Sequence, residues 1–379
     1  MAVTIDGAIS QIKLSGFKSI KKANLDLGNV NVLIGANGSG KSNFISFFQM
    51  MEFYLSSTDG LNEYVGRNGG ASSLVYYGTG ETKTIEAELA FNTNSGDNFY
   101  NVELGIAIGD KLYFKDEQVG FHRKGKLTNQ PLLPLGGGGA YTRLLQISED
   151  DPEYKNCFQT VKYIRNSMKR WSFFQFHNTT MESLIRGSSH KDSSNYLRSE
   201  GGNLAAFLYR LQEQFPRVFF SVVDTIKTIA PFIDRIIIEQ EYASPYVRLK
   251  WAEKKPNSYL LDASQMSDGT LRAIAIITLL MQPQKPPVIC IDEPELGLHP
   301  EAIVLIADLI KAASEQSQII ISTQSTKLVD CFEPEDIVVV ERKDGGTCFT
   351  RLDSAKYQSW FDEYSISETW ETNIFGGCP

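Results

Sequence analysis

The sequence predicts an α/β fold with a central sheet, an antiparallel β-lobe and an inserted, mainly helical lid. Two near-continuous apolar runs, 30–34 and 288–291, are typical of strands that are covered on both faces of a sheet. The first run leads into a glycine-rich segment and a helical pattern, and the second ends in two acids. Between them, strand-like runs at 84–91, 100–108 and 111–114 favour the antiparallel lobe.

The glycine-rich segment reads Gly35-Ala36-Asn37-Gly38-Ser39-Gly40-Lys41-Ser42. Its order of strand, loop and helix is that of a P-loop. The glycines let successive backbone N–H groups face phosphate oxygens, and the start of the helix adds unpaired donors. Lys41 can reach the β- and γ-phosphates, and the Ser42 hydroxyl can ligate Mg²⁺. The segment therefore predicts binding of a nucleoside triphosphate, and not merely a turn with a surface lysine.

Two adjacent acids, Asp292 and Glu293, end the second apolar run. They lie at the carboxyl end of the predicted strand, where open α/β sheets bind ligands. Asp292 is placed to hold the Mg²⁺ shell, and Glu293 to take a proton from the attacking water as a general base. The alternative is an acidic turn after a strand, which fits a chain with a P-loop less well.

A serine and a glycine open another helical stretch, 271–280, in the segment Met266-Ser267-Asp268-Gly269-Thr270. Such residues commonly cap a helix, and the same hydroxyl and N–H groups also suit an anion. The segment lies roughly 25 residues before the acid pair, which is the position of the signature of ABC-type ATPases. That signature serves the P-loop of a second subunit, so a role in a composite site stands beside the capping role.

Five motifs are distributed along the chain: GFKSI at 16–20, GANGSGKSN, MSDGTLR, DEPELGLHP and Ser322-Thr323-Gln324-Ser325. Together they resemble the branch of ABC-type ATPases that contains SMC, RecF and OLD-type proteins. More closely, the chain resembles the stand-alone ATPases labelled AAA-type ABC-like. The resemblance extends to 201–205 and 360–379 and so covers most of the chain. It is specific for the ATPase class and much less so for a biological role.

The resemblance implies a phosphate cradle formed by Asn37, Gly38, Ser39, Gly40, Lys41 and Ser42. It implies that Ser267 and Gly269 face the γ-phosphate bound by a partner copy, and it supports the roles assigned to the two acids. Segment 295–300 would form the D-loop at the dimer seam, with His299 near the opposing site. Lys18 and Ser19 are expected either beside the nucleotide or in an exposed turn.

The chain departs from the family pattern in two respects. Gln324 takes the switch position, which is usually a histidine. An amide can donate a hydrogen bond to a phosphate but cannot carry a proton or a positive charge, so we expect slow or conditional turnover. No glutamine stands out as the Q-loop residue. Catalytic roles are thus expected for Lys41, Glu293 and Gln324.

About 225 residues separate the P-loop from the signature, an interval that holds a long coiled coil in SMC-like proteins. Sustained heptads are absent, and the glycines at 136–139 would break a coil. Segment 131–139 is predicted as an exposed loop and 204–229 as helical, with strands at 233–239 and 246–251. The predicted organisation has three parts: 1–114, the P-loop and β-lobe; 115–230, the lid; and 231–379, the rest of the ATPase head.

Within the predicted lid, one group of basic residues comprises Lys162, Arg165, Lys169, Arg170, His177, His190, Lys191 and Arg198. The first four lie mostly on one helical face, ahead of Trp171. They predict either a grip on the phosphate backbone of nucleic acid or a solvated helix face. His177, His190 and Cys157 match no recognised metal-ligand spacing, so we expect ordinary core or surface residues there.

Composition narrows the remaining function classes. The chain has 379 residues, 42% hydrophobic and 22% charged, which suits one large or two moderate globular domains. Its five cysteines form no CxxC pair, which argues against zinc or disulfides and favours a reducing, cytoplasmic location. A net charge of −8 means that any DNA contact requires a local basic patch. We recognise no signal peptide, and the longest apolar run, 273–281, is too short to span a bilayer.

These observations predict an ATPase that binds ATP and Mg²⁺ between two head-to-tail copies and works as a switch. The resemblance implies a role in DNA metabolism or antiphage defence, through a separate effector for which a nuclease is one candidate. The alternatives are a RecF-like repair ATPase that binds DNA directly, a transporter subunit, which the GFKSI start disfavours, and a nucleotide-gated scaffold. No nuclease is expected in the chain itself, since only about 50 residues follow Ser325, and Asp353, Asp362 and Glu363 are too few.

Overall fold

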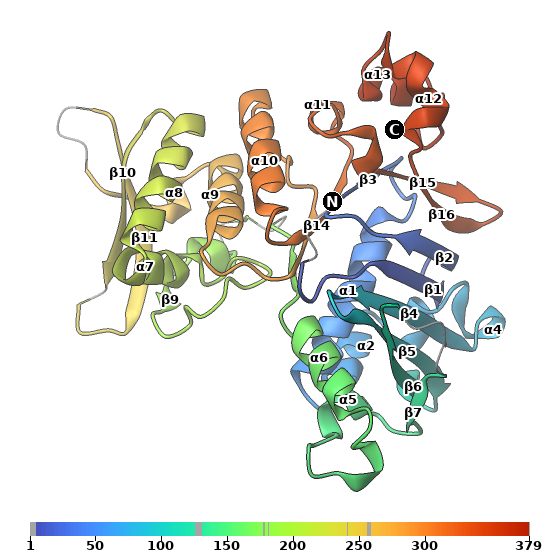
Figure 1. Ribbon diagram of the computed structural model, residues 1–379. Coiled ribbons are helices and arrows are strands. Elements are labelled where there is room, and N and C mark those ends of the chain that lie inside the picture. The colour runs from blue at the N-terminus through green and yellow to red at the C-terminus, as the bar shows by residue number, and fades with distance from the viewer. Residues whose placement is uncertain are drawn as a thin grey trace.

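The computed structural model describes residues 5–125, 131–176, 179–180, 182–240, 242–255 and 259–378 (Figure 1). Its centre is a six-stranded sheet in the order β16-β15-β3-β14-β13-β8, parallel except for β16. The strands are β3 (Val30–Ile34), β8 (Ser172–Phe174), β13 (Val288–Asp292), β14 (Gln318–Thr323), β15 (Ile337–Lys343) and β16 (Gly346–Arg351). β3 and β13 are buried at every position, so both apolar runs are central strands as predicted.

A second, antiparallel sheet forms the β-lobe, in the order β2-β1-β4-β5-β6-β7. Its strands are β1 (Gln11–Phe17), β2 (Ile20–Asp26), β4 (Thr84–Asn92), β5 (Gly96–Ala107), β6 (Lys111–Arg123) and β7 (Leu133–Gly136). The helices on this side are α1 (Lys41–Ser56), α2 (Gly60–Arg67), α3 (Ala71–Leu74), α4 (Gly78–Glu81), α5 (Arg143–Gln146) and α6 (Phe158–Met168).

A third, small sheet lies on the other side of the molecule (Figure 1). It contains β10 (Ile233–Gln240), β11 (Tyr246–Glu253), β12 (Leu261–Asp262) and β9 (Ser189–His190), which pairs with β11. The neighbouring helices are α7 (Leu204–Gln214), α8 (Pro216–Ile229), α9 (Asp268–Met281) and α10 (Pro300–Ala313). The chain closes with α11 (Thr326–Val329), α12 (Ser354–Phe361) and α13 (Ile366–Glu371).

Two hydrophobic cores lie on the two faces of the central sheet. Because side chains alternate along a strand, Leu33 of β3 packs with α1 and the β-lobe, whereas Val32 and Ile34 pack with α7, α8, α9 and α10. The sheet is thus supported on both faces, and the loops at its carboxyl edge start from a rigid base. The predicted fold class, α/β with a central sheet and an antiparallel β-lobe, is confirmed.

The structure corrects two predictions in the middle of the chain. The strand predicted at 111–114 continues to Arg123, and its pairing with β5 runs from Ala107↔Lys111 to Gly96↔Arg123. The polar residues after 114 suggested a strand end, but Glu117 is fully buried. Its carboxylate accepts hydrogen bonds from the Tyr100 hydroxyl (2.7 Å), the Thr142 hydroxyl (2.6 Å) and the backbone N–H of Arg143 (2.6 Å). Such bonds are what allow a strand to bury a carboxylate.

Segment 131–139, predicted as an exposed loop, contains the edge strand β7. Leu135 of β7 is fully buried, and Pro134, which has no N–H to donate, is tolerated at the sheet edge. The boundary expected at 114–115 therefore falls inside β6. Segment 115–230 contributes strands to all three sheets, so the division into head and lid stays a prediction.

The helical stretches and strands predicted after residue 200 are present, as α7 and α8, β10 and β11, α9 and β13. None of the helices in the described ranges is long and apolar enough to cross a membrane.

Candidate functional site

The carboxyl ends of four parallel strands meet at one edge of the central sheet, where α/β proteins bind ligands. β3 leads there into the P-loop, and β13 ends at Asp292, directly before Glu293. β14 is followed by Gln324, and β8 is followed by Gln175. The P-loop residues are thereby brought to the same edge as Asp292, Glu293 and Gln324.

The P-loop leads from β3 into α1, which begins at Lys41. Gly35, Gly38 and Gly40 have φ angles of 154°, 75° and 116°, which side chains disfavour. Lys41 is 5% exposed, and its Nζ donates to the carbonyl oxygens of Gly35 (2.6 Å) and Ala36 (3.0 Å). Burial lowers the pKa of Lys41, and neighbouring carboxylates partly oppose this shift. A cation beside the free N–H groups of a helix start fits a triphosphate.

Asp292 is 4% exposed and accepts several hydrogen bonds. Ser42 Oγ donates to its Oδ1 at 3.3 Å, and Gln175 Nε2 donates to its Oδ2 at 3.4 Å. Ser322 Oγ also donates to Oδ1. Hydroxyl, carboxylate and, after rotation, amide oxygens are the donors that Mg²⁺ prefers. The predicted metal residues Ser42 and Asp292 therefore lie together in an arrangement that fits Mg²⁺, and Gln175 joins them.

Gln175 is a candidate that the sequence did not reveal. β8 has three residues, too few to show a strand period. Its parallel pairing with β13, in the register Cys290↔Phe173 and Ile291↔Phe174, carries Gln175 to Asp292. The remaining signal in the sequence was a glutamine directly after a short aromatic run.

Gln324 bridges the P-loop and the predicted base. Its Nε2 donates to Asn37 Oδ1 at 2.6 Å and to Glu293 Oε1 at 3.0 Å. Glu293 has a φ of 47°, a left-handed conformation that is uncommon for a residue with a side chain. A neutral amide orients the carboxylate without supplying a proton or a charge. The structure therefore brings Asn37, Glu293 and Gln324 together.

Glu295 braces the segment that carries Gln324. Its Oε1 accepts hydrogen bonds from Thr323 Oγ1 (2.6 Å) and from the backbone N–H of Gln324 (3.3 Å). Its Oε2 is buried, without a hydrogen-bond partner in the part of the chain that the structure describes. Burial raises the pKa of Glu295, and the hydrogen bonds from Thr323 and Gln324 reduce the shift.

Ser267 and Gly269 lie at the start of α9, on the other side of α10 from the P-loop helix α1 (Figure 1). Ser267 is exposed, and its Oγ accepts the backbone N–H of Thr270 at 3.2 Å, as a helix cap. Gly269 touches the D-loop, since a Cβ there would lie 2.2 Å from the carbonyl oxygen of Gly297. The two residues are therefore not part of the P-loop site of their own chain.

A family model described as "AAA domain, putative AbiEii toxin, Type IV TA system" matches residues 30–330. The chain belongs to this family. This match supports the AAA-type ATPase family that the motifs indicated.

Among solved structures, the chain is similar to an Smc head bound to the C-terminal winged-helix domain of ScpA, with a TM-score of 0.60 and 18% identity over 93% of this chain and 99% of that chain. It is also similar to an Smc head with an extended coiled coil, bound to the C-terminal domain of ScpA, from Pyrococcus furiosus. That match has a TM-score of 0.56 and 17% identity over 94% of this chain and 98% of that chain. At these identities the likeness concerns the fold. No curated protein matches the chain.

In this ABC-type head, Lys18 and Ser19 support the P-loop from behind. Lys18 Nζ donates to Ser46 Oγ of α1 at 3.0 Å, and Ser19 Oγ accepts from Asn43 Nδ2 at 2.7 Å. Thr347 Oγ1 donates to the carbonyl oxygen of Ser39 and also shares a hydrogen bond with Ser19 Oγ, both at 2.8 Å. Lys18 and Ser19 are therefore not a freely exposed turn.

His299, expected near the opposing site, is the N-cap of α10. Its Nδ1 accepts the backbone N–H of Glu301 at 3.4 Å. This contact accounts for a histidine at the position without any nucleotide.

The basic residues of the predicted lid lie in separate places. Arg165 of α6 donates to the carbonyl oxygens of Leu144 (3.2 Å) and Ile147 (3.1 Å), and Arg170 pairs with Asp6 at 3.4 Å. His190 lies on β9 beside β11, apart from α6 (Figure 1). His177 lies outside the described residues. Among the described residues of this group, those in and directly after α6 therefore do not form one continuous basic surface with His190.

Proposed function

We propose that this chain binds ATP with Mg²⁺ and hydrolyses it between two head-to-tail copies. The observation that carries the proposal is the pair of hydrogen bonds from Gln324 to Asn37 and Glu293, beside Lys41 and Asp292. A P-loop cation, an oxygen-rich metal site and an oriented carboxylate are the parts that triphosphate hydrolysis requires.

In the proposed mechanism, the N–H groups at the start of α1 bind the phosphates, and Lys41 neutralises charge on the β- and γ-groups. Ser42, Asp292 and Gln175, which we assign as the Q-loop glutamine, would hold Mg²⁺, and a bound ion would withdraw charge from the phosphate oxygens. Glu293 accepts a proton from the water that attacks the γ-phosphorus, while the bond to the bridging oxygen breaks and ADP leaves. Gln324 keeps the Glu293 carboxylate in place.

Steady-state phosphate release with Mg²⁺ tests this mechanism. Glu293→Gln keeps the size of the side chain but removes the base, so ATP should bind and persist while turnover falls by roughly 10²–10⁴-fold. Lys41→Ala removes the cation, so ATP binding itself should weaken. Hydrolysis by Glu293→Gln at the wild-type rate would show that Glu293 is not the base.

The proposed dimer rests on Ser267 and Gly269, which would complete the ATP pocket of a partner copy. The exposure of Ser267 and the distance of α9 from α1 support this part. ATP should then shift monomers towards dimers. Ser267→Arg places a bulky cation in the seam and should abolish turnover, and mixing it with Lys41→Ala should restore one intact site per heterodimer. A mass in solution that ATP does not change in the Glu293→Gln protein would contradict the dimer.

The wider role that we propose is antiphage defence or DNA metabolism, exercised through a separate effector for which a nuclease is one candidate. The family description, which names a putative toxin of a type IV TA system, supports this role. We also infer a cytoplasmic location from the cysteines without a CxxC pair. Co-purification with the product of an adjacent reading frame tests for the effector.

A nucleotide-gated scaffold with negligible turnover is the second candidate. Gln324 favours it because an amide can neither take up a proton nor carry a positive charge. The phosphate-release assay separates the two. A RecF-like ATPase that grips DNA directly would need basic residues on one surface, and the separation of α6 from β9 weighs against it.

A further inference from the structure

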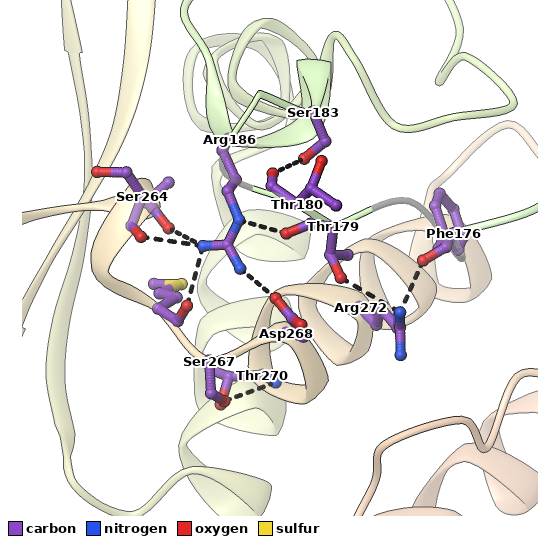
Figure 2. A network of polar contacts seen from close by, with 12 residues as sticks. Phe176, Thr179, Thr180, Ser183, Arg186, Ser264, Ser267, Asp268, Thr270 and Arg272 are labelled. Carbon is purple, nitrogen blue, oxygen red and sulfur yellow. Dashed lines mark hydrogen bonds and ion pairs between the residues drawn. The ribbon is translucent and has the colours of Figure 1, made fainter.

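Arg186 holds the signature segment through an unusual number of contacts (Figure 2). It ends the short helical turn Leu184–Arg186 and is 7% exposed. Its Nη1 donates to the carbonyl oxygens of Ala263 (3.0 Å), Ser264 (3.1 Å) and Met266 (2.9 Å). Its Nη2 pairs with Asp268 Oδ1. These four partners all belong to the six residues from 263 to 268.

The partners of Arg186 flank Ser267 on both sides. Met266, immediately before Ser267, is held through its carbonyl oxygen, and Asp268, immediately after it, through its carboxylate. Ser267 itself stays exposed at the start of α9. The guanidinium therefore fixes the backbone around Ser267 and leaves its hydroxyl at the surface.

Arg186 also balances a charge at this helix start. Asp268 lies in the first turn of α9, and its side chain is 59% exposed. Carboxylates are favourable at a helix N-terminus, but an unbalanced one would repel an incoming phosphate. The ion pair with Arg186 offsets that repulsion, so the N–H groups of α9 remain suitable for an anion.

The segment that carries Arg186 starts at the metal side of the site. Thr179, between Gln175 and Arg186, gives its carbonyl oxygen to Arg186 Nε at 2.7 Å. Arg272 of α9 donates to the carbonyl oxygen of Phe176 at 2.8 Å and to Thr179 Oγ1 at 3.2 Å (Figure 2). The chain that leaves Gln175 is therefore bonded twice to the signature region.

We propose that Arg186 is a positioning residue for the γ-phosphate of ATP bound to a partner copy. It holds Ser267 in the orientation that meets this phosphate and neutralises Asp268 beside it. The inference rests on the proposed ATP-bound dimer, and it adds a residue that lies about 80 positions before the motif it serves.

Arg186→Met tests the proposal, with each variant also studied in the Glu293→Gln background so that ATP persists. A dilute monomer should bind a fluorescent ATP analogue within about threefold of wild type, because its own P-loop is intact. ATP-driven dimerisation should be lost and kcat should fall about 100-fold, as expected when a reacting group is held loosely. Wild-type dimerisation and kcat in Arg186→Met would overturn the proposal.

Mixing experiments separate a positioning role from general destabilisation. Arg186→Met mixed with Lys41→Ala should regain turnover, because one site combines an intact P-loop with an intact signature. Arg186→Met mixed with Ser267→Arg should stay inactive, because both signatures are impaired. Rescue in the second mixture, or none in the first, would contradict the assignment of Arg186 to the signature.

Two further variants keep the test decisive if Arg186→Met does not fold. Arg186→Lys keeps the charge but not the fork of donors, so we expect about tenfold lower kcat with unchanged binding of ATP to the monomer. Asp268→Asn combined with Arg186→Lys should recover part of that loss, since it removes the carboxylate that lysine balances less well. Unchanged kcat in Arg186→Lys would overturn the proposal.

Arg143→Met is the matched control. Arg143 lies in the β-lobe region and donates to the Leu135 carbonyl oxygen and to the Tyr154 hydroxyl, both at 3.1 Å. We expect kcat within about twofold of wild type for this variant; an equal loss in Arg143→Met and Arg186→Met would mean a general effect of lost arginine bonds and refute the proposal. Ser267→Arg separates the proposed composite site from the proposed role of Arg186. If Ser267→Arg leaves turnover intact, the composite site is refuted. If Ser267→Arg abolishes turnover but Arg186→Met does not lower it, only the role of Arg186 is refuted.

Discussion

Replacing Gly40 with alanine tests whether the P-loop acts through its backbone shape. Gly40 has a φ of 116°, and a Cβ there would lie 2.2 Å from Thr347 Oγ1. The backbone strain costs about 1 kcal/mol. Moving Thr347 aside also weakens its hydrogen bonds to Ser19 and Ser39, each worth about 1 kcal/mol. Bringing the loop of the variant back to the shape that binds ATP then costs about 3 kcal/mol in total. The affinity for ATP should fall roughly 100-fold, because 1.4 kcal/mol is a factor of ten.

The assay is an equilibrium titration with a fluorescent ATP analogue and Mg²⁺, in the Glu293→Gln background. Gly38→Ala is the control: Gly38 has a φ of 75°, and among the described residues no atom beyond its chain neighbours lies within 4 Å of the position of its Cβ. This substitution adds the backbone strain but no clash, so we expect the affinity for ATP to fall less than about tenfold. Adding Thr347→Ala to Gly40→Ala should recover about tenfold. Equal losses at both glycines, or no recovery, would refute the reasoning.

Three further predictions concern the metal, pH and nucleic acid. Gln175→Leu should lower kcat at least about tenfold and raise the Mg²⁺ concentration needed for turnover, because Asp292 loses its amide neighbour. Phosphate release measured across a Mg²⁺ titration checks this, and an unchanged Mg²⁺ dependence would contradict it. Burial and the nearby Glu200 raise the pKa of Glu52 from 4.5 to about 7, so its protonated form stabilises the fold below pH 4.5, and this contribution is lost as pH rises through about 7. Glu52→Gln should therefore gain on the order of 2 kcal/mol over wild type at pH 8, measured by urea unfolding, and parallel pH curves for the two proteins would disprove the effect. The purified chain should cleave neither DNA nor RNA with ATP and Mg²⁺ or Mn²⁺, because Asp353 and Asp362 lie at the two ends of the surface helix α12; cleavage that disappears in Asp362→Asn would reveal a nuclease.

Much of the fold was readable from the sequence. The P-loop, the acid pair and the helix start at Ser267 are runs of adjacent residues whose chemistry depends on local backbone shape. β3, β13, α1 and α9 were predicted for the same reason, since the hydrophobic pattern of such an element is visible in neighbouring residues of the sequence. These elements were enough to predict an α/β fold with a P-loop, and they led to the Mg²⁺ and base residues that we propose.

Pairing between distant segments decided the rest. Gln175 meets Asp292 across 117 positions, because the three residues of β8 find their place only beside β13. Strand β6 continues past residue 114 and buries Glu117, because Tyr100 and Thr142 donate hydrogen bonds to the Glu117 carboxylate. Arg186 reads as an ordinary basic residue until the fold brings residues 263–268 to its guanidinium. The geometry of a local motif is set by neighbouring residues, whereas the role of a buried polar group depends on hydrogen-bond partners that only the folded chain brings to it.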